Sequence, residues 1–162
     1  MNKRVLAENF KIAFKNFEIA IRKHSDINKK RADGGWSVAE IADHIVKGTQ
    51  INFGATKKTE RAYDKNADSI KSTFLNFALR FPSVPQLHPT SKQYSLDEVM
   101  ESLEDNKKGI LKMIEHDDLE VTCTDISLPI WGNLTKFEWL VLIENHIIRH
   151  TRQVNDFDTI AI

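Results

Sequence analysis

Two histidines spaced to share one face of a helix carry the clearest chemical potential in this sequence. His146 and His150 lie four residues apart in the stretch FEWLVLIENHIIRHTRQV, residues 137–154. On an α-helix such positions lie about 40° apart, one turn above the other. Two imidazoles placed in this way can bind one metal ion if a third ligand faces them.

The apolar pattern of the same stretch predicts that both histidines face the interior. Its stripe consists of Leu140, Ile143, Ile147 and Val154. His150 falls within this stripe and His146 lies at its edge. A third inward histidine, His44, is predicted on a helix over residues 37–58. The inner face of that helix is expected to hold Ile41, His44, Ile45, Gly48 and Ile51.

Three histidine ligands would leave a coordination position for water or a substrate, which is typical of catalytic rather than structural zinc sites. The alternative is that three histidines at the edge of the core form hydrogen bonds with their neighbours. Neutral imidazoles buried without partners cost free energy, so the inward pair favours metal binding without deciding it. The residues three before each candidate are isoleucines, which excludes the Glu-x-x-His di-iron motif. Asp43 and Glu144 point off the ligand face, so no fourth protein ligand is expected.

The elements that would position these histidines are long amphipathic helices. Three helix starts combine a capping box with a flanking hydrophobic pair: Ser37 with Glu40, Ser95 with Glu98, and Thr135 with Glu138. Apolar spacing of three and four residues predicts helices over residues 3–23, 37–58, 96–116 and 137–154, with a short one over 68–80. Residues 121–130 favour β-structure but lack a partner strand, so they are expected to form an extended loop.

These predictions describe an all-α fold, a four-helix bundle with a short extra helix in the crossover between the second and third long helices. The length of 162 residues predicts a single domain over residues 1–162. The stretch from Phe74 to Phe81 is expected to cover the core rather than to feed an interface.

The amino-acid composition argues against several classes of protein. Lys and Arg number 23 and Asp and Glu also number 23, which argues against a large nucleic-acid-binding surface. No apolar run approaches the roughly 18 residues that a membrane span requires. The single cysteine, Cys123, excludes an internal disulfide and fits a reducing compartment. We therefore expect a cytoplasmic protein without a signal peptide.

Two stretches resemble signatures of the DinB/YfiT-like superfamily. WSVAEIADH, residues 36–44, is similar to its W-S-x-x-E-I-x-x-H pattern, and HIIRHTRQ, residues 146–153, is similar to H-x-x-R-H-x-x-Q. GNLTKFEWL, residues 132–140, resembles the usual lead-in to the last helix. The resemblance implies a DinB-type bundle in which His44, His146 and His150 bind one divalent metal ion. It favours nickel or zinc, with manganese and iron as further candidates.

The resemblance also implies roles for neighbouring residues. Gln153 is expected to contact a ligand or the residues around it, because it lies one turn from His150. Arg149 belongs to the same motif but points about 100° away, so an ordinary exposed arginine is the favoured interpretation. Glu40 precedes His44 by one turn and could orient it, although its capping role is sufficient.

Three functions remain open from the sequence. The first, which the resemblance implies, is a metal-dependent thiol S-transferase that acts on small electrophiles with a low-molecular-weight thiol. The second is a metal-dependent hydrolase that uses bound water at the same site. The third is a stress-linked module that binds a metal or a small ligand without catalysis. Analogy with similar bundles adds the expectation of a homodimer.

Overall fold

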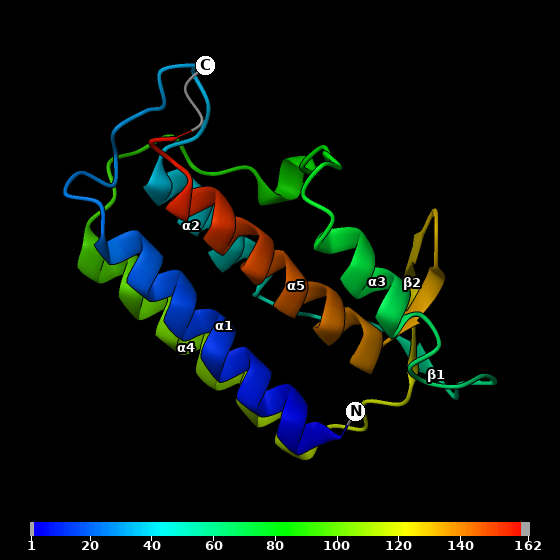
Figure 1. The fold of residues 1–162 in the computed structure, drawn as a ribbon. Coiled ribbons are helices and arrows are strands. Elements are labelled where there is room, and N and C mark those ends of the chain that lie inside the picture. The colour runs from blue at the N-terminus through cyan, green and yellow to red at the C-terminus, as the bar shows by residue number, and fades with distance from the viewer. Residues whose placement is uncertain (1, 160–162) are drawn as a thin grey trace.

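The computed structural model describes residues 2–159, which form a mostly helical protein with a small sheet (Figure 1). The helices are α1 (Lys3–Arg22), α2 (Val38–Gly48), α3 (Ala67–Phe74), α4 (Leu96–His116) and α5 (Lys136–Asn155), with a 3-10 turn η1 (Pro85–Leu87). The strands are β1 (Thr56–Lys57), β2 (Thr122–Leu128) and β3 (Gly132–Thr135).

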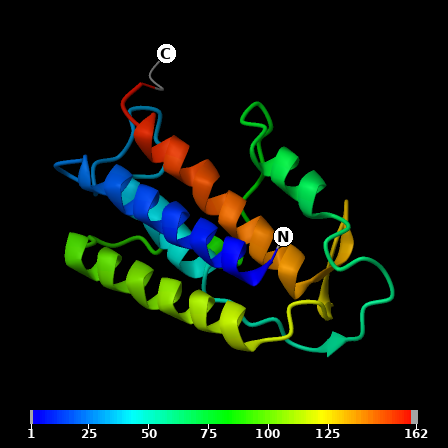
Figure 2. The same ribbon diagram turned by 60° about the horizontal axis from the view of Figure 1, so that its bottom comes forward.

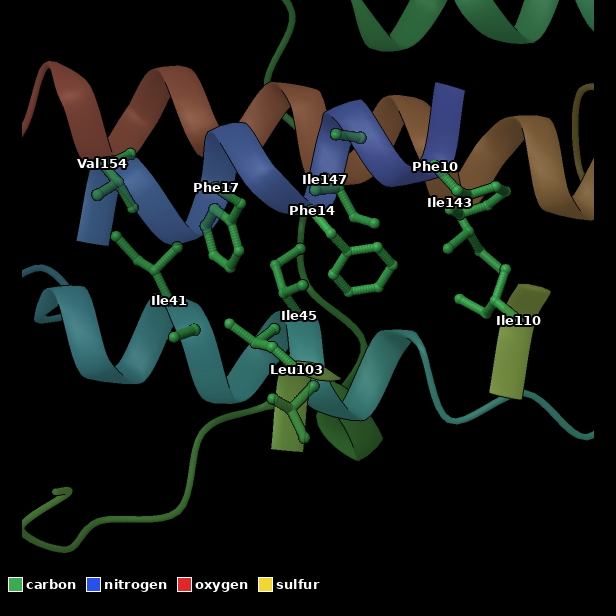
Figure 3. Close-up of a cluster of buried hydrophobic side chains, with 14 of the residues drawn as sticks. Phe10, Phe14, Phe17, Ile41, Ile45, Leu103, Ile110, Ile143, Ile147 and Val154 are labelled. Carbon is green, nitrogen blue, oxygen red and sulfur yellow. The ribbon is translucent and has the colours of Figure 1, made fainter. Parts of the chain in front are cut away.

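The core lies between α1, α2, α4 and α5, whose apolar faces meet in one cluster (Figure 3). α1 packs along α5 on one side and along α4 on the other, as Figure 2 shows, while α2 contacts both α4 and α5. The predicted apolar stripe of residues 137–154 is buried, whereas the predicted inner face of residues 37–58 is buried only as far as Ile45, with Gly48 and Ile51 partly exposed. Phe10, Phe14 and Phe17 of α1 are fully buried, as are Ile41 and Ile45 of α2. Burial of these faces fixes how each helix is rotated about its own axis.

Two of the three predicted capping boxes are complete. Ser37 accepts a hydrogen bond from the Glu40 backbone and Glu40 accepts one from the Ser37 backbone. Thr135 and Glu138 repeat this arrangement at the start of α5. The third box is incomplete: Ser95 caps α4, but the Glu98 carboxylate forms an ion pair with Lys92 instead of returning to the cap.

The predicted helix over residues 37–58 was too long, since α2 ends at Gly48. Thr49 donates its hydroxyl to the carbonyl of Ile45, and Asn106 donates its amide to the carbonyl of Val46. These side chains satisfy the last carbonyls of α2, so the helix can stop inside the protein. The predicted short helix over residues 68–80 was also too long, because α3 ends at Phe74.

The interpretation of residues 121–130 as an extended loop was wrong. They contribute β2, which pairs antiparallel with β3 after a turn over residues 129–131. Gly132, the first residue of β3, has φ +67°. On its other side β2 pairs with β1, with Thr56 opposite Cys123. Because β1 has only two residues, it leaves no periodic pattern that a sequence could reveal.

The phenylalanine stretch covers the core only in part. Phe74 packs against the core, but Phe77 is 39% exposed and Phe81 is 44% exposed. The ring of Phe81 stacks on that of Phe74 at 5.4 Å. The expectation that the whole stretch is core therefore fails beyond Phe74. Within residues 2–159, no helix combines the length and the apolar character needed to cross a membrane.

Candidate metal centre

The three predicted ligands meet at one point between α2 and α5. His44 Nε2 and His150 Nε2 each lie 3.0 Å from His146 Nε2. One nitrogen from each of the three rings lies within 4.8 Å of the others, and the rings are nearly perpendicular in pairs. The sequence predicted the pair on α5 from its spacing and the third histidine from the apolar face of α2. The structure brings all three together.

Local structure explains why the rings converge. His146 and His150 share the face of α5 that turns toward α2, next to the fully buried Ile147. His44 precedes Ile45, which faces the same core layer from α2 (Figure 3). The capping boxes fix where both helices begin, and the buried stripes fix their rotation. These two constraints together set the direction of each imidazole.

Oxygen acceptors hold two of the rings in one tautomer. His44 Nδ1 lies 2.8 Å from the Leu87 carbonyl oxygen, and His150 Nδ1 lies 2.6 Å from Gln153 Oε1. An oxygen acceptor requires a proton on the facing nitrogen, so each Nδ1 donates and each Nε2 keeps a lone pair. Both lone pairs are directed at the ring of His146. Gln153 therefore makes the contact that the sequence predicted for it.

The three histidines do not carry enough protons to donate a hydrogen bond to every nitrogen lone pair at the centre of the cluster. A proton on His146 Nε2 can satisfy well only one of the two lone pairs that face it. The other lone pair then faces the same nitrogen at 3.0 Å with no proton directed at it. A cation at the centre would satisfy all three nitrogens at once. Imidazole suits zinc, copper, iron and nickel, and second-sphere acceptors on the remote nitrogen are typical of metal-ligating histidines.

Burial keeps the three imidazoles neutral. It lowers the pKa of His44, and it lowers the pKa of His150 to about 3, with the neighbouring His44 adding to the effect. Burial, reinforced by the other two histidines, places the pKa of His146 well below its ordinary value. Neutral imidazole is the form that binds a metal ion, so the cluster is ready for one at neutral pH.

Two aromatic rings from outside α2 and α5 pack against the histidine cluster. The ring of Trp36, just before α2, lies 5.2 Å from that of His44. Phe74, at the end of α3, meets the ring of His146 edge-on at 6.1 Å. A methyl group at Gly48 would lie 3.6 Å from the His146 ring, so the backbone of α2 passes close to this histidine.

Arg149 has a role that the sequence did not predict. Its guanidinium donates hydrogen bonds to the carbonyls of Phe74, Asn76 and Leu79. The interpretation of an ordinary exposed arginine was therefore wrong. Arg149 fastens the segment that follows α3 to the helix that bears two of the histidines. It also satisfies the carbonyl of Phe74, the last residue of α3.

Glu40 does not contact the histidines. Its carboxylate accepts hydrogen bonds from the Ser37 backbone and from Lys30, which favour the ionised form and lower its pKa although burial opposes them. Its function is the helix cap. Asp43 is also engaged elsewhere, by the Thr90 backbone and the Tyr94 hydroxyl. In the part of the chain that the structure describes, the histidines are joined by no carboxylate or thiol as a further ligand.

The Leu87 carbonyl is the site contact that sequence reasoning missed. It belongs to η1, 43 residues from His44 along the chain. A backbone carbonyl has no side-chain signature, and no periodic pattern marks a single 3-10 turn. Pro85 and Pro89 on either side of Leu87 are the only local sign that this segment has a fixed path.

Comparison with known proteins gives one finding. The model of the DinB superfamily matches residues 14–154, a span that includes all three histidines and Gln153. No curated protein and no solved structure matches.

Proposed function

The chain belongs to the DinB superfamily, and from that membership and the histidine geometry we propose that it is a metal-dependent enzyme of the thiol S-transferase type. The proposed substrates are a low-molecular-weight thiol and a small electrophile. The proposed cofactor is one divalent ion, nickel or zinc, held by His44, His146 and His150. We include in the proposal the four-helix-bundle architecture of the DinB type, formed by α1, α2, α4 and α5.

The observation that carries the proposal is the convergence of three Nε2 atoms with too few protons among them. His146 Nε2 lies 3.0 Å from each of its two neighbours, and the outer two rings donate their Nδ1 protons away from the centre. A purely structural cluster would be expected to satisfy its lone pairs internally. Three ligands are also one fewer than a closed structural zinc site uses.

A bound divalent ion would lower the pKa of a thiol at its open position and so supply a thiolate at neutral pH. The chain's own contribution is orientation and exclusion of water. The Leu87 carbonyl and Gln153 hold the outer imidazoles in place. Trp36 and Phe74 supply apolar surface beside the rings. Arg149 holds the segment after Phe74 against α5.

Hydrolysis is the second candidate at the same site, with water in place of the thiol. A nearby carboxylate would favour it as a general base. Asp43, the nearest acid in sequence to His44, is bonded to Thr90 and Tyr94 instead. The thiol reaction needs no such base, because the ionised thiol is itself the nucleophile. This difference favours transfer over hydrolysis.

The first test is metal content. The untagged protein, His150→Ala and the control His116→Ala would be purified together and subjected to elemental analysis after incubation with nickel and zinc. His116 lies at the exposed end of α4, away from the site. We expect one ion per chain in the wild type and the control, and none in His150→Ala. A wild type without metal would refute the proposed centre.

The second test is turnover of the metal-loaded protein. Cysteine, glutathione and a sugar-linked cysteine thiol would each be mixed with 1-chloro-2,4-dinitrobenzene, with an activated ester assayed in parallel. Metal-dependent loss of the thiol with formation of a thioether is the expected result. Metal-dependent ester cleavage without thioether would replace transfer by hydrolysis. A metal-loaded protein inactive in both assays would leave metal binding without catalysis.

A further inference from the structure

The crossover between α3 and α4 has no buried side chain of its own to anchor it. In residues 75–93, all of which the structure describes, every side chain is exposed or only partly buried. Figure 1 shows this segment as the green chain that leads from the end of α3 to the start of α4. Yet it carries the Leu87 carbonyl, which lies 2.8 Å from His44 Nδ1. Because segments with few buried contacts open easily, polar contacts must hold this carbonyl in place.

Charged residues of α2 and α5 supply those polar contacts, one group at each end of the crossover. Arg149 of α5 holds the start of the crossover through the carbonyls of Asn76 and Leu79. Asp43 and Lys47 of α2 hold its end. The crossover is therefore fastened to the same two helices that bear the three histidines.

Lys47 directs its ammonium group at three acceptors in this contact. Its Nζ lies 2.6 Å from the His88 carbonyl oxygen, 3.1 Å from Thr90 Oγ1 and 3.0 Å from Asp43 Oδ2. An ammonium group has three donors, so its acceptors match them in number. His88 directly follows Leu87 in the chain. The bond to its carbonyl therefore holds the peptide unit next to the Leu87 carbonyl.

Asp43 completes the contact from the preceding turn of α2. Its Oδ2 accepts hydrogen bonds from the Thr90 backbone N–H and from the Tyr94 hydroxyl, both at 2.9 Å. The backbone of Tyr94 in turn exchanges two hydrogen bonds of 2.9 Å with the Asn28 side chain. Asp43 and Lys47 also form an i,i+4 pair, but such a pair alone contributes only about 0.2–0.5 kcal/mol to a helix. Their bonds to the crossover are the larger part of what they do.

Both residues lie on the same side of His44. On an α-helix, Asp43 and Lys47 are offset from His44 by about 100° and 60° in the same direction. The crossover therefore meets its two anchors and the imidazole on one side of α2. A shift of the crossover would be passed directly to the acceptor of His44 Nδ1.

We propose that Asp43 and Lys47 are positioning residues that set the orientation and the tautomer of His44. They hold residues 88–90 against α2 and so keep the Leu87 carbonyl opposite His44 Nδ1. That carbonyl keeps the proton on Nδ1 and leaves Nε2 free to bind a metal ion. The inference deepens the proposed function and rests on its metal centre for one of two readouts. The other readout needs no metal.

The first test uses the metal-free full-length protein. Heteronuclear NMR of nitrogen-labelled protein identifies which ring nitrogen of His44 carries the proton. We expect the proton on Nδ1 in the wild type and a mixture of both tautomers in Lys47→Met, because the acceptor would no longer be held in place. Lys47→Arg keeps a cationic donor and should restore the wild-type signal. An unchanged tautomer in Lys47→Met would overturn the proposal, even if the variant were less stable.

Lys107→Met is the matched control for loss of a half-buried lysine. The Lys107 side chain is 23% exposed, close to the 27% of Lys47, and it also pairs with a carboxylate on its own helix, that of Glu104. Its other ion-pair partner, Glu18, lies on α1 rather than on the crossover. We expect the wild-type tautomer of His44 in this control. An equal change in Lys107→Met would show that general destabilisation is the cause, and would overturn the proposal.

Nickel affinity is the second readout. Isothermal titration should give a Kd about tenfold higher in Lys47→Met and in Asp43→Ala, the lower end of the effect of losing an outer contact to a metal-binding histidine. Asp43→Asn keeps an acceptor for the Thr90 N–H and should lose less.

The two readouts separate this inference from the proposed function. If the wild type binds nickel and both Lys47→Met and Asp43→Ala keep its full affinity, the positioning role is refuted. If the wild type binds no nickel, yet the tautomer of His44 changes in Lys47→Met and not in Lys107→Met, the proposed metal centre fails. The positioning role of Asp43 and Lys47 is then supported without it.

Discussion

At the N-terminal end of α5, Glu138 is fully buried and the chain satisfies its carboxylate. Arg61 donates to both of its oxygens, and the backbone amides of Asn66 and Thr135 donate to one oxygen each. About two and three turns later on the same helix, His146 and His150 present their nitrogens to each other and to His44. There the chain orients the three rings but does not supply enough protons to pair all of their central nitrogens.

The difference separates a structural polar cluster from a candidate site. Buried polar groups in folded proteins are nearly always paired, and Glu138 obeys this rule within its own chain. The histidines obey it only on their outer nitrogens. An exogenous cation would complete the set that the chain leaves incomplete. The contrast therefore predicts that changes near Glu138 affect folding, whereas changes near the histidines affect ligand binding.

The largest expected effect comes from Glu138→Ala. Removal of one partner of a buried ion pair leaves the Arg61 guanidinium without its counter-charge and two backbone amides without an acceptor. Such a loss typically costs about 3–5 kcal/mol of unfolding free energy. Urea denaturation would measure it. Glu98→Ala is the matched control, because Glu98 is exposed and completes no capping box, and it should cost less than about 1 kcal/mol. Similar losses in the two variants would contradict the structural role of Glu138.

Metal addition should have the next largest effect. A ligand that binds only the folded state at a free concentration one hundred times its Kd adds about 2.7 kcal/mol to the unfolding free energy. Nickel or zinc should give this increment in the wild type and in Glu138→Ala, but not in His150→Ala. Removal of the ion with a chelator should reverse it. An increment that vanishes in Glu138→Ala would mean that the two ends of α5 are not independent.

Gln153 should tune the affinity rather than create the site. Replacement by Leu removes the acceptor that holds His150 Nδ1 at 2.6 Å, and loss of such a contact typically weakens metal binding about tenfold to a hundredfold. Gln153→Glu keeps an acceptor and should retain the affinity. Isothermal titration with nickel would compare the three proteins. Unchanged affinity in Gln153→Leu would show that the contact does not orient the ring.

The smallest expected effect concerns Cys123. A thiolate is a soft metal ligand, but Cys123 lies on β2 rather than beside the histidines. Burial raises the pKa of its thiol from 9.0 to about 11. At pH 8 the thiolate fraction should therefore be about a hundredfold lower in the folded than in the unfolded protein. Alkylation by iodoacetamide, with and without urea, would measure the difference.

The same shift fixes a pH dependence. The folded pKa is raised, so the neutral thiol favours the folded state fully below pH 9.0, and this contribution disappears as the pH rises toward about 11. Comparison with Cys123→Ala would isolate it. Rapid alkylation of the native protein at pH 8 would instead show that Cys123 is reactive, and that it is not a purely structural residue.

Much of the candidate site was predictable because its signals are local. The i,i+4 spacing of His146 and His150 and the place of His44 on an apolar face follow from helical periodicity. Gln153 was singled out by the family resemblance, and its position one turn after His150 predicted the contact. Arg149 and Leu87 could not be placed in this way. Their contacts join segments more than 40 residues apart, and each contact has a backbone carbonyl as its acceptor.

By itself, the sequence determined the helical character of this protein, two complete helix caps and the residues that face the core, because each of these depends on neighbours within a few turns. Only the tertiary structure decided where α2 and α3 stop, that residues 122–128 find partner strands, and that Arg149 holds the crossover. These depend on hydrogen-bond partners supplied from distant segments, such as Asn106 for α2 and β1 for β2. Periodicity carries no information about such partners, since they are brought together only when the helices pack.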